Sequence, residues 1–164
     1  MSLKKVNRLS MLIAISVVIS ILESYIPFLN SIIPGLKLGL ANIPILFILD
    51  RYSFKDAMYV SVVRVFLVSL MKTGLFNIPF FFSLGGAILS IVMMYFFKKL
   101  NIFSLIGVSI IGSISHSVGQ IIIGIFLINN SIIYYLPYLL IFSIPTGLVV
   151  GIITKKLLDY TKNM

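Results

Sequence analysis

Apolar segments recur along this chain from Leu9 to Leu158, and the gaps between them are only a few residues long. The sequence has 164 residues, of which 60% are hydrophobic and 10% are charged. So few charged residues cannot cover the surface of a water-soluble domain of this size. We therefore expect an all-α integral membrane protein in which residues 1–164 form a single transmembrane domain.

Six of these segments have the character of membrane helices. A helix that crosses the hydrocarbon core needs roughly 20 predominantly apolar residues, or fewer where neighbouring helices shield it from lipid. Proline removes a backbone donor, so Pro44, Pro137 and Pro145 are expected to kink helices or to start them. The predicted helices cover residues 9–28, 38–49, 54–71, 78–97, 102–128 and 132–158.

The basic residues alternate between the two ends of these helices. Lys37 and Lys72 fall in gaps on one side, and Arg64 lies within a predicted helix. Because cytoplasmic loops carry an excess of Lys and Arg, the opposite side is predicted to be cytoplasmic, with both termini on it. That side holds ten of the thirteen basic residues, namely Lys4, Lys5, Arg8, Arg51, Lys55, Lys98, Lys99, Lys155, Lys156 and Lys162.

The formal net charge of +9 also raises the question of a nucleic-acid partner. Proteins that bind nucleic acid gather their basic residues on one face or along one helix. Here the basic residues are scattered in ones and twos at helix ends. Membrane topology explains them, so we expect the lipid bilayer and no nucleic acid as a partner.

A few polar side chains fall at membrane depth, where charged groups are rare and are candidates for function. Counting ~1.5 Å per residue from the cytoplasmic ends, Arg64 lies at ~15 Å and Glu23 and His116 lie at ~21 Å in a ~30 Å core. Gln120 is one turn farther out, and Asn42 enters from the opposite side. We expect these side chains to converge on an outward-facing cavity that binds a substrate.

With Lys37 and Lys72 at its outer rim, this cavity would be net positive and would suit an anionic or amphipathic small ligand. Arg64 is the best anchor, because a guanidinium stays charged in a low dielectric and grips carboxylate or phosphate with two hydrogen bonds. The two lysines have a second interpretation, since long basic side chains often only mark the membrane interface.

The buried polar residues also have structural interpretations. Arg64 can pair with Glu23 and lock two helices together, because charges inside a membrane usually find an internal partner. His116 can form a neutral hydrogen bond between helices, since a lone His without nearby carboxylates is a poor metal site. The same alternative applies to Gln120 and Asn42.

Small residues at a spacing of four indicate close contact between helices. Ser10 and Ala14 have this spacing near the cytoplasmic end of the first predicted helix, and Gly147 and Gly151 have it in the last one. Ser10 and Ala14 can contact a partner protein, or they can serve packing within the chain.

Motifs for catalysis are missing from the sequence. There is no GxxxxGK[ST] loop for nucleotide hydrolysis, so an ATP-driven step would need another subunit. No pair of carboxylates has the spacing expected for Mg²⁺ with a diphosphate, and the only His has no carboxylate in its own helix. We predict no catalytic residues, no metal site and no cofactor, and we do not expect an enzyme.

Four local patterns stand out in the sequence. They are Lys37-Leu38-Gly39-Leu40-Ala41-Asn42, the single Arg64, Ser83-Leu84-Gly85-Gly86 with Leu89-Ser90, and His116-Ser117-Val118-Gly119-Gln120. Together they resemble a family of small bacterial membrane proteins, the heptaprenyl diphosphate synthase component I family, also called the Gx transporter family. The resemblance covers residues 9–156. The resemblance implies a multi-pass protein of the bacterial cytoplasmic membrane.

The size and six-helix layout of that family are similar to the S-components of energy-coupling-factor (ECF) transporters. In those proteins the S-component captures a vitamin-like compound and docks on a transmembrane coupling subunit with ATPases. The resemblance therefore implies an S-component-like bundle, with Ser10 and Ala14 nearest to the docking role. The family label hints at an isoprenoid or quinone precursor as the substrate of such an importer.

Two other functions remain open. The chain can be a non-catalytic membrane subunit that recruits a prenyl-transferring enzyme to the bilayer in heptaprenyl diphosphate synthesis. Prenyl diphosphate synthases themselves are typically soluble and carry aspartate-rich Mg²⁺ motifs that this chain lacks. A purely structural membrane protein is the third alternative, and it predicts that loss of the Arg64–Glu23 pair unfolds the bundle.

Overall fold

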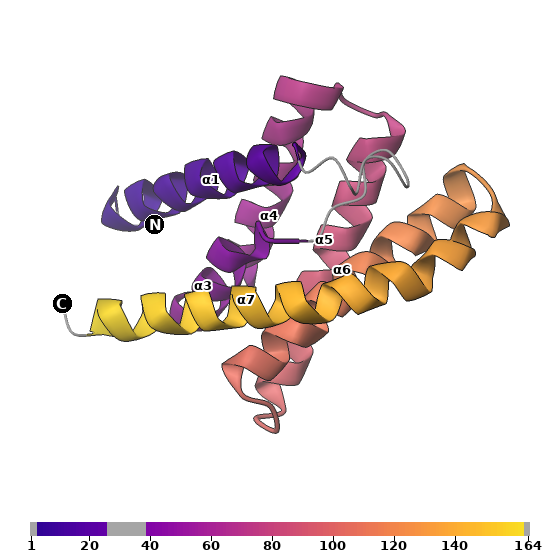
Figure 1. The fold of residues 1–164 in the computed structure, drawn as a ribbon. Helices are drawn as coiled ribbons and strands as arrows, with labels where there is room; N and C mark the ends of the chain where they lie inside the picture. The colour runs from indigo at the N-terminus through magenta and orange to yellow at the C-terminus, as the bar shows by residue number, and fades with distance from the viewer. Residues whose placement is uncertain (1–2, 26–38, 163–164) are drawn as a thin grey trace.

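The structure, a computed structural model, describes residues 3–25 and 39–162. This part of the chain is built of helices and turns and contains no strand. In chain order the helices are α1 (Leu3–Glu23), α3 (Asn42–Arg51), α4 (Phe54–Val68), the π-helix η1 (Ser69–Thr73), α5 (Ile78–Lys99), α6 (Leu105–Leu127), the 3₁₀-helix η2 (Asn130–Tyr135) and α7 (Leu136–Lys162) (Figure 1).

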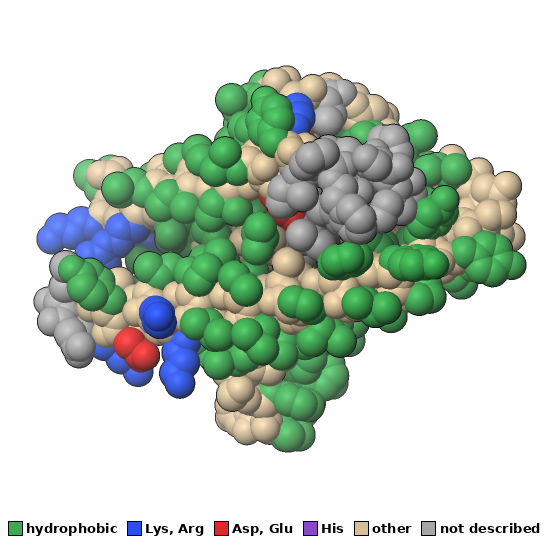
Figure 2. All heavy atoms as spheres, in the orientation of Figure 1, with side chains coloured by type: hydrophobic (Ala, Val, Ile, Leu, Met, Phe, Trp, Pro, Cys, Tyr) green, Lys and Arg blue, Asp and Glu red, His purple; other side chains and the backbone are tan. Residues whose placement is uncertain are grey.

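Four stretches of the described chain are long and apolar enough to cross a membrane: Leu3–Glu23, Ile78–Lys99, Leu105–Leu127 and Asn130–Lys162. Many of their large apolar side chains face outward, among them Leu22 and Phe126, which are 63% and 82% exposed. Figure 2 shows such side chains spread over the surface, with the basic ones gathered mainly at one edge. The chain is therefore an all-helical, multi-pass membrane protein.

The first two predicted helices differ from the structure at their boundaries. α1 begins at Leu3, before the predicted residue 9, because exposed basic residues continue the helix beyond its apolar part. It ends at Glu23, and the rest of the predicted range up to residue 28 includes residues outside the described ones. α3 begins at Asn42 instead of residue 38, because Gly39 has a φ of 94°, which no right-handed helix accommodates.

The boundaries of three later helices also have local causes. α4 ends at Val68 and its path continues as η1, which stops at Gly74 with a φ of 84°. α6 begins at Leu105, because the Ser104 hydroxyl caps it by accepting the Gly107 N–H at 3.2 Å. Pro145 lies inside α7, which extends to Lys162 instead of ending at residue 158.

Glycines let α5, α6 and α7 pack with their backbones close together. A Cβ atom on Gly119 of α6 would lie 2.6 Å from the Gly85 carbonyl oxygen of α5. A Cβ on Gly147 of α7 would lie 2.6 Å from the Ile110 Cα of α6, and the Ser109 hydroxyl donates to the Gly147 carbonyl at 2.7 Å. The small-residue spacing in the last helix thus serves packing within the chain.

The N-terminal helices form the other half of the molecule. α1 packs on α3 and α4, and α3 also packs on α7 (Figure 1). Buried apolar residues hold these helices against α5, among them Leu9, Ile45, Val60 and Ile91.

Several helix ends gather where the two chain termini lie, and we call this region the basic end. It comprises the start of α1, the loop between α3 and α4, and the end of α7 (Figure 1). The end of α5 lies lower in Figure 1 and is joined to this region through α3. Lys5 pairs with Asp56 at 2.7 Å, which joins α1 to α4, and Lys98 pairs with Asp50 at 2.9 Å, which joins α5 to α3. Segments that the charge pattern assigns to one side therefore meet in the structure.

Candidate functional site

A polar cluster lies where the end of α1, the turn before α3, the middle of α4 and the middle of α6 meet. We call it the interior cluster and define it by Glu23, Gly39, Ala41, Arg64 and His116. These residues line a cavity of about 10 Å³, which is room for about one water molecule. Ser20, Val65, Val68 and Ser83 complete the lining.

The buried face of α4 brings Arg64 into this cluster. The helix starts with a capping box in which Ser53 and Asp56 satisfy each other's backbone N–H groups. Its buried residues then recur at helical spacing, and Arg64 among them is only 3% exposed. The guanidinium donates a hydrogen bond from Nη1 to the Ala41 carbonyl oxygen at 2.8 Å.

Glu23 occupies the last position of α1, on the same buried face as Ser16 and Ser20. It is 3% exposed, and its Oε1 accepts the Gly39 backbone N–H at 2.5 Å. The carboxylate also attracts the Arg64 guanidinium electrostatically. Two opposite charges are thus close together in the interior, where burial of either one alone would be costly.

Both charges hold the same short turn. Glu23 accepts from the N–H of Gly39, and Arg64 donates to the carbonyl of Ala41, two residues later. Glycine suits the first position because its φ is 94°, and because a Cβ there would lie 3.1 Å from Asn42 Nδ2 and 3.6 Å from the His116 ring. The turn therefore acts as a backbone bridge between a carboxylate and a guanidinium.

His116 reaches the cluster from α6 and is 2% exposed. Its Nε2 lies 3.4 Å from Nε2 of Gln120, one turn along the same helix. Within the described part of the chain, the Gln120 Oε1 is buried without a hydrogen-bond partner. Gly86 of α5 makes room for the ring, since a Cβ there would be 3.0 Å from His116 Cε1.

Asn42 lies beside the cluster and is part of a chain of hydrogen bonds between helices. Its Nδ2 donates to the Ser90 hydroxyl at 3.3 Å, and that hydroxyl donates to the Gly112 carbonyl at 2.8 Å. These bonds join α3 to α5 and α5 to α6. The contacts of Asn42 thus match the structural interpretation, in which it connects helices.

Of the two lysines predicted at the rim of the cavity, the structure describes only Lys72. Lys72 is exposed at the end of α4 and η1, where its Nζ donates to the Ser24 hydroxyl and lies 4.0 Å from the centre of the Tyr25 ring. It therefore holds the end of α1 next to the cluster without lining the cavity. Lys37 lies outside the described residues.

Ser10 and Ala14 are both exposed on α1, so neither is buried in packing within the chain. In contrast, Ser16 and Ser20 of the same helix face the interior. Ser10 and Ala14 thus lie on a face that is open to a partner.

Two polar residues of the cavity, Ser20 and Ser83, were not among the predicted site residues. Ser20 lies three positions before Glu23, so helical spacing places it on the same face. Ser83 begins one of the four patterns, and its hydroxyl donates to the Pro79 carbonyl at 2.8 Å. Both signals were visible in the sequence, but serines are too common in membrane helices to stand out.

The four patterns meet in space. The turn at Gly39, Arg64, the helix crossing at Gly86 and the segment from His116 to Gln120 surround the interior cluster or contact it directly. They come from four separate parts of the chain. Their convergence makes this cluster the candidate functional site.

Comparison with known proteins supports one family. The model of the heptaprenyl diphosphate synthase component I family matches residues 12–157. No curated protein and no solved structure matches the chain significantly.

Proposed function

The chain belongs to the heptaprenyl diphosphate synthase component I family, and we propose that it is a substrate-binding membrane subunit of an ECF-type importer. In this proposal it resembles an S-component, with six transmembrane helices and both termini in the bacterial cytoplasm. It captures a small anionic or amphipathic organic compound, such as an isoprenoid or quinone precursor. It is not itself an enzyme, and a transmembrane coupling subunit with ATPases supplies the energy.

The observation that carries this proposal is the buried Arg64 beside the turn at Gly39–Ala41. A guanidinium has five N–H donors, and one hydrogen bond to the Ala41 carbonyl leaves capacity for an anionic ligand. Ionisable side chains inside a membrane protein are functional candidates by default, because burying them is costly. A carboxylate or phosphate is the group that a guanidinium grips with two hydrogen bonds.

The cavity in this structure is closed, since about 10 Å³ admits no organic molecule. Arg64 and Glu23 both hold the turn at Gly39–Ala41. We propose that an incoming anion replaces the Ala41 carbonyl as the partner of Arg64. The turn would then move away from α4 and open the site to a ligand.

Substitution of Arg64 by Lys tests this site. Lys keeps the positive charge but cannot form the planar, two-bond grip, so we expect at least a tenfold loss of the small molecule that co-purifies with the protein. Mass spectrometry of extracts from protein purified in mild detergent measures it. Lys156→Gln, an exposed change at the basic end, should keep the ligand. Full retention of ligand by folded Arg64→Lys would refute the site.

The family's description favours a second candidate, a non-catalytic membrane subunit that recruits a prenyl-transferring enzyme. The two functions predict different protein partners in the same purification. An ATPase with a transmembrane coupling subunit supports import, and exposed Ser10 and Ala14 would lie in that contact. A soluble prenyltransferase without an ATPase supports recruitment and argues against import.

The proposed orientation can be tested directly, because the chain has no cysteine. We expect Tyr134→Cys, at the end opposite the basic end, to react with a membrane-impermeant maleimide in intact cells. Lys162→Cys should react only after the membrane is opened. Reaction of Lys162→Cys in intact cells would reverse the proposed topology.

A further inference from the structure

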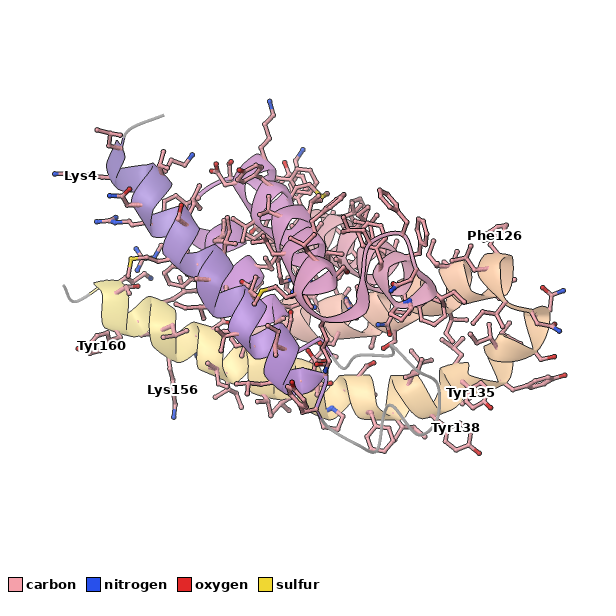
Figure 3. All side chains as sticks on the ribbon, turned by 90° about the horizontal axis from the view of Figure 1, so that it is seen from above. Lys4, Phe126, Tyr135, Tyr138, Lys156 and Tyr160 are labelled. Carbon is pink, nitrogen blue, oxygen red and sulfur yellow. The ribbon has the colours of Figure 1, made fainter. Side chains whose placement is uncertain are left out.

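A groove separate from the interior cluster lies at the basic end, between α1, α3 and the end of α7. Its volume is about 650 Å³. Figure 3 shows the start of α1, marked by Lys4, and the end of α7, marked by Tyr160, at the same end of the molecule. The groove is lined by Arg8, Met11, Leu12, Ile15, Phe47, Arg51, Tyr52 and Thr161.

The polar end of this groove is cationic. Among the described residues, Arg8 and Arg51 line it and no carboxylate does. In the described part of the chain, the ion pairs of the basic end use Lys5 and Lys98 and leave both arginines without a carboxylate partner. One nitrogen of Arg51 donates to the Leu158 carbonyl at 2.9 Å and to the Thr161 hydroxyl at 3.0 Å. These bonds fix the Arg51 guanidinium at the edge of the groove.

The other end of the groove is apolar and open. Met11 and Ile15 are 67% and 49% exposed, and Phe47 of α3 also lines the groove. The apolar stripe continues along α1 through Val18 and Leu22, which are 56% and 63% exposed. From Met11 to Leu22 the helix rises about 16 Å, which is long enough to lie beside much of an acyl chain.

This combination identifies the chemistry of the occupant. Two guanidinium groups match a phosphate, which accepts paired hydrogen bonds, and the apolar stripe matches a hydrocarbon chain. Basic pockets between membrane helices at the cytoplasmic surface are suited to anionic lipid headgroups. We propose that this groove binds an anionic phospholipid of the membrane, with its phosphate between Arg8 and Arg51 and one acyl chain along α1.

The site differs from the substrate site of the proposed importer in place and in ligand. The groove lies at the basic end, whereas the interior cluster is closed around Arg64 in the middle of the bundle. Bound lipid would seal the space between α1 and α7 in the bilayer. Lipid binding therefore stands even if the proposed import function fails.

Native mass spectrometry of the full-length protein in mild detergent tests the proposal with phosphatidylglycerol as the probe and phosphatidylcholine as the neutral reference. The groove variant Arg8→Gln/Arg51→Gln removes two positive charges. The control Lys155→Gln/Lys156→Gln removes two charges from exposed residues of α7 that do not line the groove. Lys156 points away from α1 in Figure 3.

We expect one phosphatidylglycerol to bind in preference to phosphatidylcholine, and the groove variant to bind it about tenfold more weakly than the control does. Arg8→Gln alone leaves the contacts between α3 and α7 intact, and it should weaken binding severalfold even if the double variant does not fold.

Three results would overturn the proposal. The first is that the groove variant and the control lose the same amount of phosphatidylglycerol binding. The lipid would then be attracted by the overall positive charge of the basic end and not by the groove. The second is unchanged binding in folded Arg8→Gln. The third comes from crosslinking of a Met11→Cys variant. If its Cys crosslinks to a helix of another protein and no lipid is bound, the groove is a protein-docking surface.

Discussion

The interior cluster and the basic end contain the same kinds of charged groups but use them differently. In the interior, Arg64 and Glu23 are each 3% exposed, and each bonds to the backbone of one turn. At the basic end, Lys5 and Asp56 pair directly at 2.7 Å, with side chains 34% and 12% exposed. One region holds its charges through backbone groups inside the bundle, and the other pairs them at the surface.

This difference determines how much we expect each region to contribute to the free energy of unfolding. Water and salt weaken an exposed ion pair, which contributes little to stability. Water and salt do not solvate a buried charge in the same way, so the cost of burying it is no longer offset when its partner is removed. We therefore expect substitutions in the interior cluster to cost far more than equivalent substitutions at the basic end, and the predictions below test that order.

The largest effect should come from separating the two buried charges. Arg64→Met removes the buried guanidinium that attracts the Glu23 carboxylate and bonds to the Ala41 carbonyl, and we expect a loss of about 3–5 kcal/mol in the free energy of unfolding. Glu23→Gln should also destabilise the protein. Unfolding in detergent can be followed by circular dichroism, because the chain has no Trp for fluorescence.

The double variant Arg64→Met/Glu23→Gln decides whether the charges are coupled. It removes both ions, so it should be less destabilised than the sum of the two single variants. Simple additivity would show that the two side chains stabilise the turn independently of each other.

The sequence alone was enough to predict much of this region. Hydropathy placed the long helices, and the rarity of charges at membrane depth singled out Arg64, Glu23 and His116, which line one cavity in the structure. The contact of both charges with one turn was not predictable. It depends on the positive φ of Gly39 and on backbone atoms, which no side-chain pattern specifies.

The helix boundaries show the same limit. Boundaries depend on single caps and turns, such as the Ser104 hydroxyl at α6, whereas hydropathy is an average over many residues. The small-residue spacing was ambiguous for a related reason. Gly147 packs inside the chain and Ser10 is exposed, although the two patterns look alike in the sequence.

A smaller effect should follow from changing the turn itself. Gly39→Ala forces a side chain into a residue with φ of 94° and brings a Cβ to 3.1 Å from Asn42 Nδ2, so we expect a loss of about 2 kcal/mol. Gly74→Ala is a matched control, because its φ is 84° but the nearest side-chain atom is 3.6 Å away. Equal losses in thermal unfolding would mean that the interior cluster adds nothing to the backbone strain.

The hydrogen bonds beside the cluster should contribute less. Ser90→Ala removes the hydroxyl that joins Asn42 to the Gly112 carbonyl, and we expect a loss of about 1 kcal/mol. Ser16→Ala is the control, since that buried hydroxyl donates to the Leu12 carbonyl of its own helix at 2.7 Å and bonds to no other helix in the described part of the chain. If the two variants unfold at the same temperature, the bonds between helices do not stabilise the bundle.

The smallest effect belongs to the basic end. Lys5→Gln breaks the pair with Asp56, and we expect a loss of about 0.2–1 kcal/mol that disappears in about 1 M salt. Lys4→Gln is an exposed neighbour that controls for net charge. Thermal unfolding of the two variants at low and high salt measures the difference, and a loss that persists at high salt would show that this pair is shielded like the interior one.

The pH dependence of the same pair follows from Asp56. Its hydrogen bond with Lys5, and then the one with Ser53, lower the pKa of the Asp56 carboxyl below its ordinary value of 3.8. A carboxyl with a lowered pKa stabilises the folded state above that ordinary value and loses this contribution as the pH falls through the folded-state pKa. The stability difference between the wild type and Lys5→Gln should therefore be constant near neutral pH and shrink only below pH 3.8. A difference that already shrinks near neutral pH would assign the effect to another group and weaken the contrast between the two regions.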